Sequence, residues 1–511
     1  MKMKALLKQV QIIKISTSRL KRANWDLKAS YAELIARDEL IRVSNSQLYR
    51  WLKTEDYYAY NDNIVAVVAE SVVDFDRACS KKGFKINDIE YVRLLGTTGG
   101  VKSNTVLFIR KDRHDEIHNK IENGRHMDIK LVPAKYEAYR ALVATGSIPL
   151  TQPKHPIVVK DIETTFKDEV ILVDGSNTTK EDNRPTMKKV KDYEVTLDAN
   201  DGFGLVSPTL MKQWSLDIKE RTEDEDYICG GICLRNAFLK GMVFPFDYVA
   251  FAEEVAHTYE ITDIYGDVHD IREVDLVITE SQLKLWSAYD SMEEYLENCE
   301  KNGYDFCACK VSERELEDTR RLNYQYLQSY ELSDEDIAEL CQPTLDWIAE
   351  CSGGDYLKVL AFLGASEEKG FKDTQVFVRA IQANPEILKD KWIREKVNKL
   401  LVKKKDEAKI GKLICEGNYQ IIGGDPYALC QGMFGLKITG LLRPNEVYNS
   451  YWIEKDVDEI LLFRSPMTNH NNIRRVKLDN REEVKEWFKY INNIVLLSAF
   501  DTITIALNGA D

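Results

Sequence analysis

The stretch Asp198-Ala-Asn-Asp-Gly-Phe-Gly-Leu-Val-Ser-Pro208 packs two glycines, two aspartates and a proline into a tight turn. Glycine lets a backbone approach a ligand or another chain segment closely. Loops of this composition are common, so the stretch alone is compatible with an ordinary turn and with a ligand-binding loop. The segments that follow it along the chain give it more meaning.

The segment Ile232-Cys-Leu-Arg-Asn-Ala-Phe-Leu-Lys-Gly-Met-Val-Phe244 predicts a pair of apolar strands with Lys240 and Gly241 between apolar residues. An ammonium group in an apolar setting costs free energy unless an anion meets it. Lys240 is therefore either a surface lysine at a hairpin turn or a cation placed for an anionic ligand.

A third segment, Asp275-Leu-Val-Ile-Thr-Glu-Ser-Gln-Leu-Lys-Leu-Trp286, predicts a strand that enters a helix. The first turn of that helix would present Ser281 and Lys284. A helix start with a nearby cation suits a phosphate group, although many surface helices share the pattern.

In this order and spacing, the three segments resemble the first double-psi barrel of the two-barrel RNA polymerases. The closest likeness is to the eukaryotic-type RNA-dependent polymerases and their phage single-chain relatives, which have a D-G-x-G-x-x-S turn, an F-x-x-R…K-G strand and a helix with a second lysine. The counterparts here are Asp201, Gly202, Gly204 and Ser207 in the turn, Lys240 with Gly241 in the strand, and Ser281 with Lys284 in the helix. The family's arginine between the aromatic residue and the lysine is out of register, with Arg235 close by.

The segment Leu461-Leu-Phe-Arg-Ser-Pro-Met-Thr-Asn-His470 resembles the family's R-x-P…H segment, which precedes a metal-binding aspartate loop. Arg464 either forms a salt bridge at a strand end or donates two parallel hydrogen bonds to hydroxyl or phosphate oxygens of a nucleotide. The tail Asp501-Thr-Ile-Thr-Ile-Ala-Leu-Asn-Gly-Ala-Asp511 alternates like a strand up to an Asn-Gly turn. It aligns with the start of the Asp-x-Asp-Gly-Asp loop, so Asp511 is a predicted metal ligand.

The predicted fold is an α+β multidomain chain with two double-psi β-barrels separated by a helical region, the second barrel being incomplete. The expected regions are a mixed helix-rich N-terminal region, the first barrel, a helical connector and the partial second barrel, at 1–156, 157–290, 291–425 and 426–511. Helix is expected over 31–54 and 389–405. Strands are expected at 157–159, 169–173, 193–197, 227–229 and 241–244.

Composition limits the alternatives. The 511 residues carry a formal net charge of −14, which argues against a general nucleic-acid coat but not against an internal nucleic-acid groove. The ten cysteines show no C-x-x-C spacing, which fits reduced thiols and a cytoplasmic location. No run of eighteen apolar residues occurs, so no membrane partner is expected. The segment Gly96-Thr-Thr-Gly-Gly-Val-Lys-Ser103 departs from a P-loop because Val101 separates glycine from lysine, and a β-hairpin turn is the favoured interpretation.

The resemblance implies template-directed RNA synthesis from nucleoside triphosphates with Mg²⁺ as cofactor. The implied partners are a nucleic acid template, the RNA product and nucleoside triphosphates, with DNA and RNA templates both open. The implied catalytic residues are Lys240, Lys284 and Arg464. The implied substrate or nucleic-acid contacts are Asp201, Gly202, Gly204, Ser207, Arg235 and Ser281.

A single carboxylate, Asp511, cannot build a tight Mg²⁺ site. The chain is therefore expected to be inactive alone. It would be the front part of a longer polymerase, which is the preferred explanation, or would pair with a second polypeptide that completes the metal loop. The competing hypothesis is a non-catalytic nucleic-acid-binding or scaffold protein that kept the polymerase fold.

Overall fold

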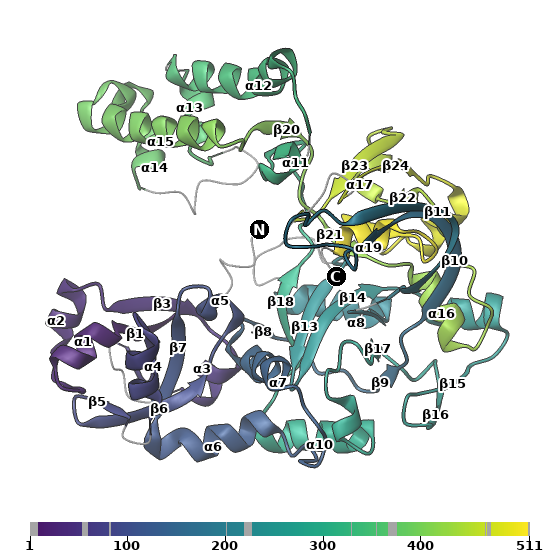
Figure 1. The fold of residues 1–511 in the computed structure, drawn as a ribbon, viewed down its shortest axis with the longest axis horizontal. Helices are drawn as coiled ribbons and strands as arrows, with labels where there is room; N and C mark the ends of the chain where they lie inside the picture. The colour runs from purple at the N-terminus through teal and green to yellow at the C-terminus, as the bar shows by residue number, and fades with distance from the viewer. Residues whose placement is uncertain are drawn as a thin grey trace. The chain divides into compact units, whose positions relative to one another are not determined.

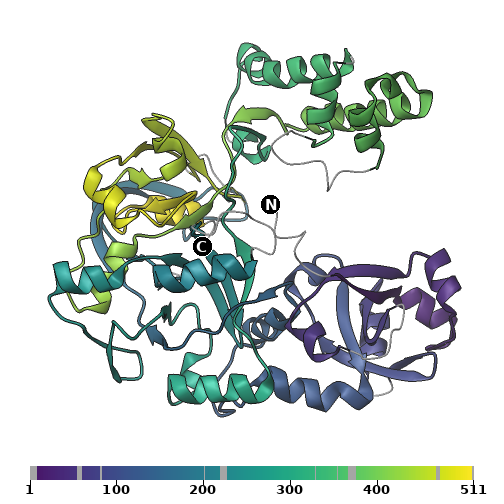
Figure 2. The same cartoon turned by 180° about the vertical axis from the view of Figure 1, so that it is seen from behind.

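The computed structural model describes residues 9–53, 60–80, 83–200, 202–218, 227–328, 330–353, 355–365, 376–465, 467 and 472–508. These residues fall into two compact units, each drawn from opposite sides in Figures 1 and 2. Unit 1 comprises Met1–Arg314, Gln420–Asp458 and Lys477–Asp501, and unit 2 comprises Glu315–Tyr419, Glu459–Val476 and Thr502–Asp511. The four-region division at residues 156, 290 and 425 stays a prediction.

The N-terminal part of unit 1 is a seven-stranded sheet in the order β2-β5-β6-β7-β4-β1-β3 (Figure 1). Its strands are β1 (Gln9–Ser16), β2 (Asp26–Leu27), β3 (Leu40–Ser44), β4 (Asn61–Val68), β5 (Phe84–Ile86), β6 (Ile89–Leu95) and β7 (Thr105–Arg110). The accompanying helices are α1 (Thr17–Arg22), α2 (Tyr31–Ala36), α3 (Gln47–Trp51), α4 (Val72–Cys79), α5 (Thr98–Val101), α6 (Lys111–Glu122), α7 (Pro133–Arg140) and the 3₁₀ helix η2 (Ala141–Ala144). The helical turn α5 connects antiparallel β6 and β7, where the sequence predicts a hairpin turn.

The helix predicted over 31–54 is wrong, because this segment divides into α2, β3 and α3. Asp38 takes the left-handed conformation after α2 (φ +53°), which ends that helix. The β-branched strand β3 then pairs antiparallel with β1 along its whole length. Ser46 caps α3 by accepting a hydrogen bond from the backbone N–H of Tyr49.

The central part of unit 1 is a second seven-stranded sheet, in the order β8-β18-β13-β14-β12-β17-β9. Its strands are β8 (Ile148–Pro149), β9 (Pro156–Val159), β12 (Phe203–Val206), β13 (Ile232–Asn236), β14 (Leu239–Pro245), β17 (Leu276–Thr279) and β18 (Cys307–Val311). Two hairpins extend from it, β10 (Glu163–Asp174) with β11 (Thr186–Asp198) and β15 (Glu260–Thr262) with β16 (Val268–Asp270). The helices are α8 (Pro208–Ile218), α9 (Tyr248–Phe251), the π-helix η3 (Ala252–Ala256), the 3₁₀ helix η4 (Trp286–Ala288) and α10 (Met292–Asn302). The strands predicted at 157–159, 169–173, 193–197 and 241–244 lie in β9, β10, β11 and β14, whereas 227–229 is not a strand.

A smaller sheet in unit 1 repeats the strand order of the central sheet. It contains β21 (Ile421–Gly423), β22 (Glu446–Tyr448), the end of β24 (Ile473–Leu478) and β25 (Ile494–Leu497). Numbered by chain order, its four strands lie 1-4-2-3 and pair parallel, antiparallel and parallel. Strands β9, β17, β12 and β14 of the central sheet have the same order and the same three pairings. Two copies of one barrel-like topology are therefore present, as the sequence predicts.

The smaller sheet is accompanied by α16 (Pro426–Met433), α17 (Ser450–Ile453) and α18 (Glu482–Trp487). Glycines let it lie close against the central sheet. A side chain added at Gly423 would meet the Phe244 ring at 2.5 Å, and one added at Gly230 would overlap the backbone of Asn492. Phe244, Phe488 and Leu496 are fully buried members of the shared core. The two copies therefore form one packed body within unit 1.

Unit 2 is mainly helical, and its residues 315–419 are drawn in shades of green in Figure 1. Its helices are α11 (Gln325–Gln328), α12 (Asp334–Ser352), α13 (Tyr356–Phe362), α14 (Val376–Ala383), the 3₁₀ helix η6 (Pro385–Lys389), α15 (Lys391–Lys409) and α19 (Ile503–Asn508). Its strands are β19 (Thr319–Arg321), β20 (Ile414–Glu416), β23 (Glu459–Phe463) and the first part of β24. The helix predicted over 389–405 is confirmed by α15. Among all residues that the structure describes, no helix is long and apolar enough to span a membrane.

We expect Gly230→Ala to lower the free energy of unfolding by about 1–3 kcal/mol, because the new methyl group collides with rigid backbone atoms. Urea unfolding followed by circular dichroism measures this change. Gly99→Ala is the matched control, since nothing lies within 4 Å of a side chain added there. Equal stability of the two variants would contradict the close approach of the two sheets.

Candidate functional site

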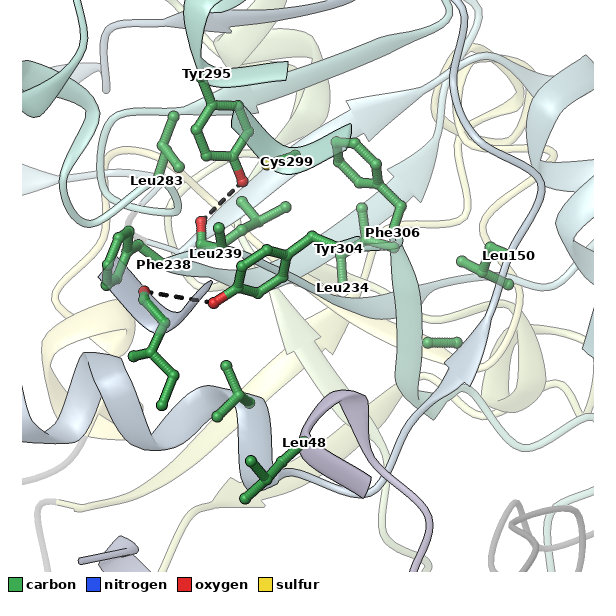
Figure 3. Packing of buried hydrophobic residues seen from close by; sticks show 14 of the residues in the cluster. Leu48, Leu150, Leu234, Phe238, Leu239, Leu283, Tyr295, Cys299, Tyr304 and Phe306 are labelled. Carbon is green, nitrogen blue, oxygen red and sulfur yellow. Dashed lines mark hydrogen bonds between the residues drawn. The ribbon is translucent and has the colours of Figure 1, made fainter. Parts of the chain in front are cut away.

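The β13–β14 hairpin carries the lysine singled out by the sequence. Asn236 pairs with Leu239, so Ala237 and Phe238 form a two-residue turn. Phe238 has a φ of +55°, which is a strained conformation for a bulky side chain. The turn is held by the buried Phe238 ring and by the hydroxyl of Tyr295, which donates to the Ala237 carbonyl over 2.8 Å (Figure 3).

Lys240 and Lys284 are brought together by a short backbone pairing. Leu239 and Leu283 form an isolated antiparallel bridge, and both are fully buried in the cluster of Figure 3. On its two sides, the Lys240 N–H donates to the Gln282 carbonyl over 3.0 Å, and the Lys284 N–H donates to the Phe238 carbonyl over 3.1 Å. Lys240 is exposed and Lys284 is half-buried. The two lysines therefore flank one bridge, and their catalytic role stays a prediction.

Ser281 meets the glycine turn, but not at the start of a helix. The Ser281 hydroxyl accepts from the Gly202 N–H over 2.9 Å and donates to the Asp161 carboxylate over 2.8 Å. After β17 the chain forms a turn, and the next helical element is η4 (Trp286–Ala288). The predicted helix start at Ser281 is therefore wrong, and a helix N-terminus supplies no phosphate site there.

The side chain of Gln282, a residue that the sequence motif does not single out, accounts for the glycines at positions 204 and 241. The fully buried Gln282 side chain accepts from the Thr279 N–H over 3.0 Å and donates to the Met242 carbonyl over 2.7 Å. A side chain at Gly204 or Gly241 would overlap this amide. These two glycines therefore make room for a protein side chain.

Gly202 and Ser207 have local structural roles. Gly202 has a φ of +78°, a conformation that favours glycine. The Ser207 hydroxyl accepts from the Leu210 N–H over 3.2 Å and so satisfies a free donor at the start of α8. Asp201, which directly precedes Gly202 in the predicted motif, is outside the described residues, as is Asp511. A ligand contact of Gly202, Gly204, Ser207 or Ser281 stays a prediction.

Arg235 faces Lys240 directly across the β13–β14 pair. Like charges at opposed positions destabilise a strand pair unless an anion lies near them. The Arg235 guanidinium donates to the Cys233 sulfur over 3.2 Å and to the Leu234 carbonyl over 2.7 Å. A hydrogen bond from Cys309, followed by the charges of Arg235 and Lys240, lowers the pKa of Cys233 against the opposing effect of burial. The Cys233 sulfur therefore acts as an acceptor beside the two cations.

Cys309 comes close to Cys233 through an irregularity in the β13–β18 pairing. Cys233 pairs with Lys310, and the next residue, Leu234, pairs with Ala308. This shift in register leaves Cys309 without a partner of its own in the strand pairing. The Cys233 thiolate and burial raise the pKa of Cys309. Along the sequence, Cys233 lies close to Cys229 and Cys309 lies close to Cys307, so residue spacing does not reveal the contact between Cys233 and Cys309.

Arg464 belongs to unit 2 and follows β23 directly. Its guanidinium donates to the Leu507 carbonyl over 3.3 Å, and the Asn472 side chain donates to the Ala506 carbonyl over 2.9 Å. Both carbonyls are at the end of α19, where a helix leaves acceptors free. In the structure, Arg464 therefore holds a helix end, and its role toward a nucleotide stays a prediction.

The strand predicted for the tail is wrong, because residues 503–508 form α19. The buried positions are Ile503, Thr504, Ala506 and Leu507, which lie on one face of a helix because they are spaced one, three and four residues from Ile503. Ile505, whose burial the alternation requires, is 44% exposed. Asn508 of the predicted Asn-Gly turn is the last residue of α19, and Gly509 lies outside the described residues.

The described residues contain one cluster of metal-ligand type, formed by His126, Asp290 and Glu294. Hence no set of three carboxylates surrounds Lys240 or Arg464 within the described residues. They do not by themselves fit a Mg²⁺ site, and the predicted ligand Asp511 is outside them.

In sequence and in fold the chain is similar to RNA polymerases, which supports the resemblance seen in the sequence. The chain is 27% identical over 423 residues to the DNA-directed RNA polymerase YonO of Bacillus phage SPbeta, across 80% of this chain and 46% of that protein. Its fold matches the RNA-dependent RNA polymerase QDE-1 from Thielavia terrestris with a TM-score of 0.55 and 13% identity, across 92% of this chain and 49% of that one. The second likeness concerns the fold alone. The chain spans about half the length of both relatives, and no protein-family model matches it.

We expect Tyr295→Phe to lower the free energy of unfolding by about 1–3 kcal/mol, because the buried Ala237 carbonyl loses its hydrogen bond. Urea unfolding measures the change. Tyr304→Phe is the control from the same cluster, since the Tyr304 hydroxyl donates to the Ile121 carbonyl over a longer 3.5 Å (Figure 3). An effect of Tyr295→Phe no larger than that of the control would argue against Tyr295 as the anchor of the hairpin turn.

The low pKa of Cys233 predicts a pH-dependent stability. Between the lowered pKa of the folded protein and the ordinary thiol pKa of about 8.5, the unfolded chain binds more protons at this residue, so stability rises with pH. The stability difference between the unaltered protein and Cys233→Ser should therefore grow over this window in urea unfolding. Cys430→Ser should give a constant difference there, because burial raises the pKa of Cys430. A constant difference for Cys233→Ser would disprove the thiolate.

Proposed function

We propose that this chain forms part of an RNA polymerase that joins nucleoside triphosphates on a nucleic acid template. The observation that carries the proposal is the meeting of Lys240 and Lys284 at the Leu239–Leu283 bridge, with Arg235 opposite Lys240. Three cationic residues on neighbouring segments suit a polyphosphate or a nucleic acid backbone. The likeness to polymerases that use DNA and RNA templates supports RNA synthesis and leaves both template types open.

In this reaction the 3′-hydroxyl oxygen of the growing RNA bonds to the α-phosphorus of the incoming nucleotide. The bond from that phosphorus to the pyrophosphate oxygen breaks, and the hydroxyl proton leaves. Negative charge increases on the phosphate oxygens as the reaction proceeds. Lys240 and Lys284 would neutralise this charge, and Arg235 would add to the positive field around Lys240.

The remaining predicted residues would position these groups. Arg464 would orient the incoming nucleotide through its planar guanidinium. The hydrogen bond between Ser281 and Gly202 would hold the glycine turn next to the lysine-bearing segment. Asp201 would take part from this turn.

Mg²⁺, when bound, lowers the pKa of the attacking hydroxyl and stabilises the leaving pyrophosphate. Asp511 would be one of its ligands. Because Mg²⁺ needs several oxygen ligands, the site would also take carboxylates beyond Asp511, from a longer chain or a second polypeptide. This chain by itself would then bind nucleic acid without making RNA. Its cytoplasmic location is part of the same proposal.

We expect Lys240→Ala to reduce nucleotide incorporation by about 100-fold or more while urea stability changes little, because an exposed side chain is removed. Primer extension with Mg²⁺ measures incorporation, using the polypeptide or complex that carries the complete metal loop. Lys167→Ala, on an exposed strand of the β10–β11 hairpin, is the control.

Unchanged incorporation by Lys240→Ala would remove Lys240 from the proposed site. A protein with the complete loop that binds nucleic acid but incorporates no nucleotide would instead support the competing hypothesis of a non-catalytic nucleic-acid-binding protein.

A further inference from the structure

Helix α15 concentrates positive charge in an acidic protein. It contains eight lysine and arginine residues and three carboxylates, whereas the whole chain has a net charge of −14. The neighbouring α12 has six carboxylates and no basic residue. The two helices, both labelled in Figure 1, pack together, so an acidic and a basic helix are neighbours in the helical part of unit 2.

One face of α15 faces the interior of this helical part. Ile393, Val397 and Leu401 are buried there in a cluster that includes Cys351 of α12. The outward side of α15 is left to solvent and carries most of its charge. Glu395 and Asp406 are the exposed carboxylates on it, and Asp406 is already paired with Lys409 over 3.0 Å.

Four residues form a continuous stripe along this outward side, which we call the Trp–Lys stripe. They are Trp392, Lys396, Lys399 and Lys403, spaced four, three and four residues apart, so they lie in one row on the helix. The row is about 16 Å long at 1.5 Å per residue. Within the part of the chain that the structure describes, Lys399 and Lys403 are exposed and form no ion pair.

Trp392 is 58% exposed, which is unusual for the largest apolar side chain. The Lys396 ammonium lies over its ring at 4.7 Å from the centroid and over the Phe377 ring at 4.2 Å. Phe377 also meets Trp392 edge-on, with centroids 6.3 Å apart. The indole is therefore fixed in place while more than half of it stays open to solvent.

We propose that the Trp–Lys stripe binds an unpaired nucleic acid strand. Lys399 and Lys403 would contact its phosphates, and a base would stack on the open side of Trp392. Charge complementarity points to a polyanion, and the fixed aromatic ring points to unpaired bases, since paired bases do not expose a face for stacking. The inference rests on the proposed function, in which template and product supply such strands.

The test is binding of a fluorescein-labelled thymidine 20-mer to the 511-residue chain, measured by fluorescence anisotropy over a series of salt concentrations. For single strands, each lost phosphate contact lowers the salt slope of log K by about 0.7. We expect the double variant Lys399→Gln, Lys403→Gln to lower the slope by about 1.4. Trp392→Ala should weaken binding of the single strand by about tenfold and change binding of a 20-base-pair duplex much less.

The matched control is Lys404→Gln with Lys409→Gln, which removes the same charge from the same helix. These lysines are already paired, with Glu407 over 3.1 Å and with Asp406 over 3.0 Å. The proposal is overturned if the control lowers the slope as much as the stripe variant, or if the unaltered chain does not bind the 20-mer. It is also overturned if the stripe variants abolish self-association in sedimentation and leave binding of the 20-mer intact.

The binding assay requires no nucleotide incorporation, so it separates this inference from the proposed function. An unchanged salt slope in the stripe variants would overturn the stripe alone, whereas unchanged incorporation in Lys240→Ala would overturn the proposed polymerase site alone.

Discussion

The candidate site depends on the buried amide of Gln282. Its side chain joins the end of β17 to β14 through hydrogen bonds with Thr279 and Met242. The backbone carbonyl of Gln282 accepts a hydrogen bond from the Lys240 N–H. An unpaired amide in this place would cost several kcal/mol, so the three segments must come together for the fold to be stable. Positions 204 and 241 must therefore be glycine, because a side chain at either position would overlap the Gln282 amide. The same interaction therefore sets the backbone positions from which both lysines project.

Much of the fold follows from local sequence patterns. Strand β9 is apolar and rich in β-branched residues, β14 is mostly apolar, and the amphipathic spacing of α15 is unambiguous, so both kinds of element are predictable. The N-terminal region is harder, because short elements alternate within a few residues. The pattern over 31–54 satisfies helical spacing, yet pairing of β3 with β1 overrides it. In the tail the opposite happens, because a segment with a strand-like pattern and β-branched residues forms the helix α19. The side chains of Arg464 and Asn472 donate hydrogen bonds to the carbonyls that are free at the end of this helix.

For the site, sequence order identifies the segments but not the contacts between them. The motif leads to Gly204, Gly241, Lys240 and Lys284, and the structure does place their segments side by side. Gln282 stands among those same residues and carries no pattern of its own, because a buried amide and a surface amide look alike in a sequence. Asp161 is missed for the same reason, since its partner Ser281 is 120 residues away. Contacts of this kind depend on tertiary packing, which residue spacing does not encode.

Strain and charge accumulate at the same hairpin. Phe238 holds a conformation that favours glycine, and Arg235 lies opposite Lys240, so the free protein keeps two unfavourable arrangements within a few residues. Burial of the Phe238 ring and the Tyr295 hydrogen bond offset the first, and the Cys233 sulfur, which accepts from Arg235, partly offsets the second. In the proposed function, an arriving polyphosphate would meet a positive potential that is already assembled, so little reorganisation would be needed when charge develops on its oxygens.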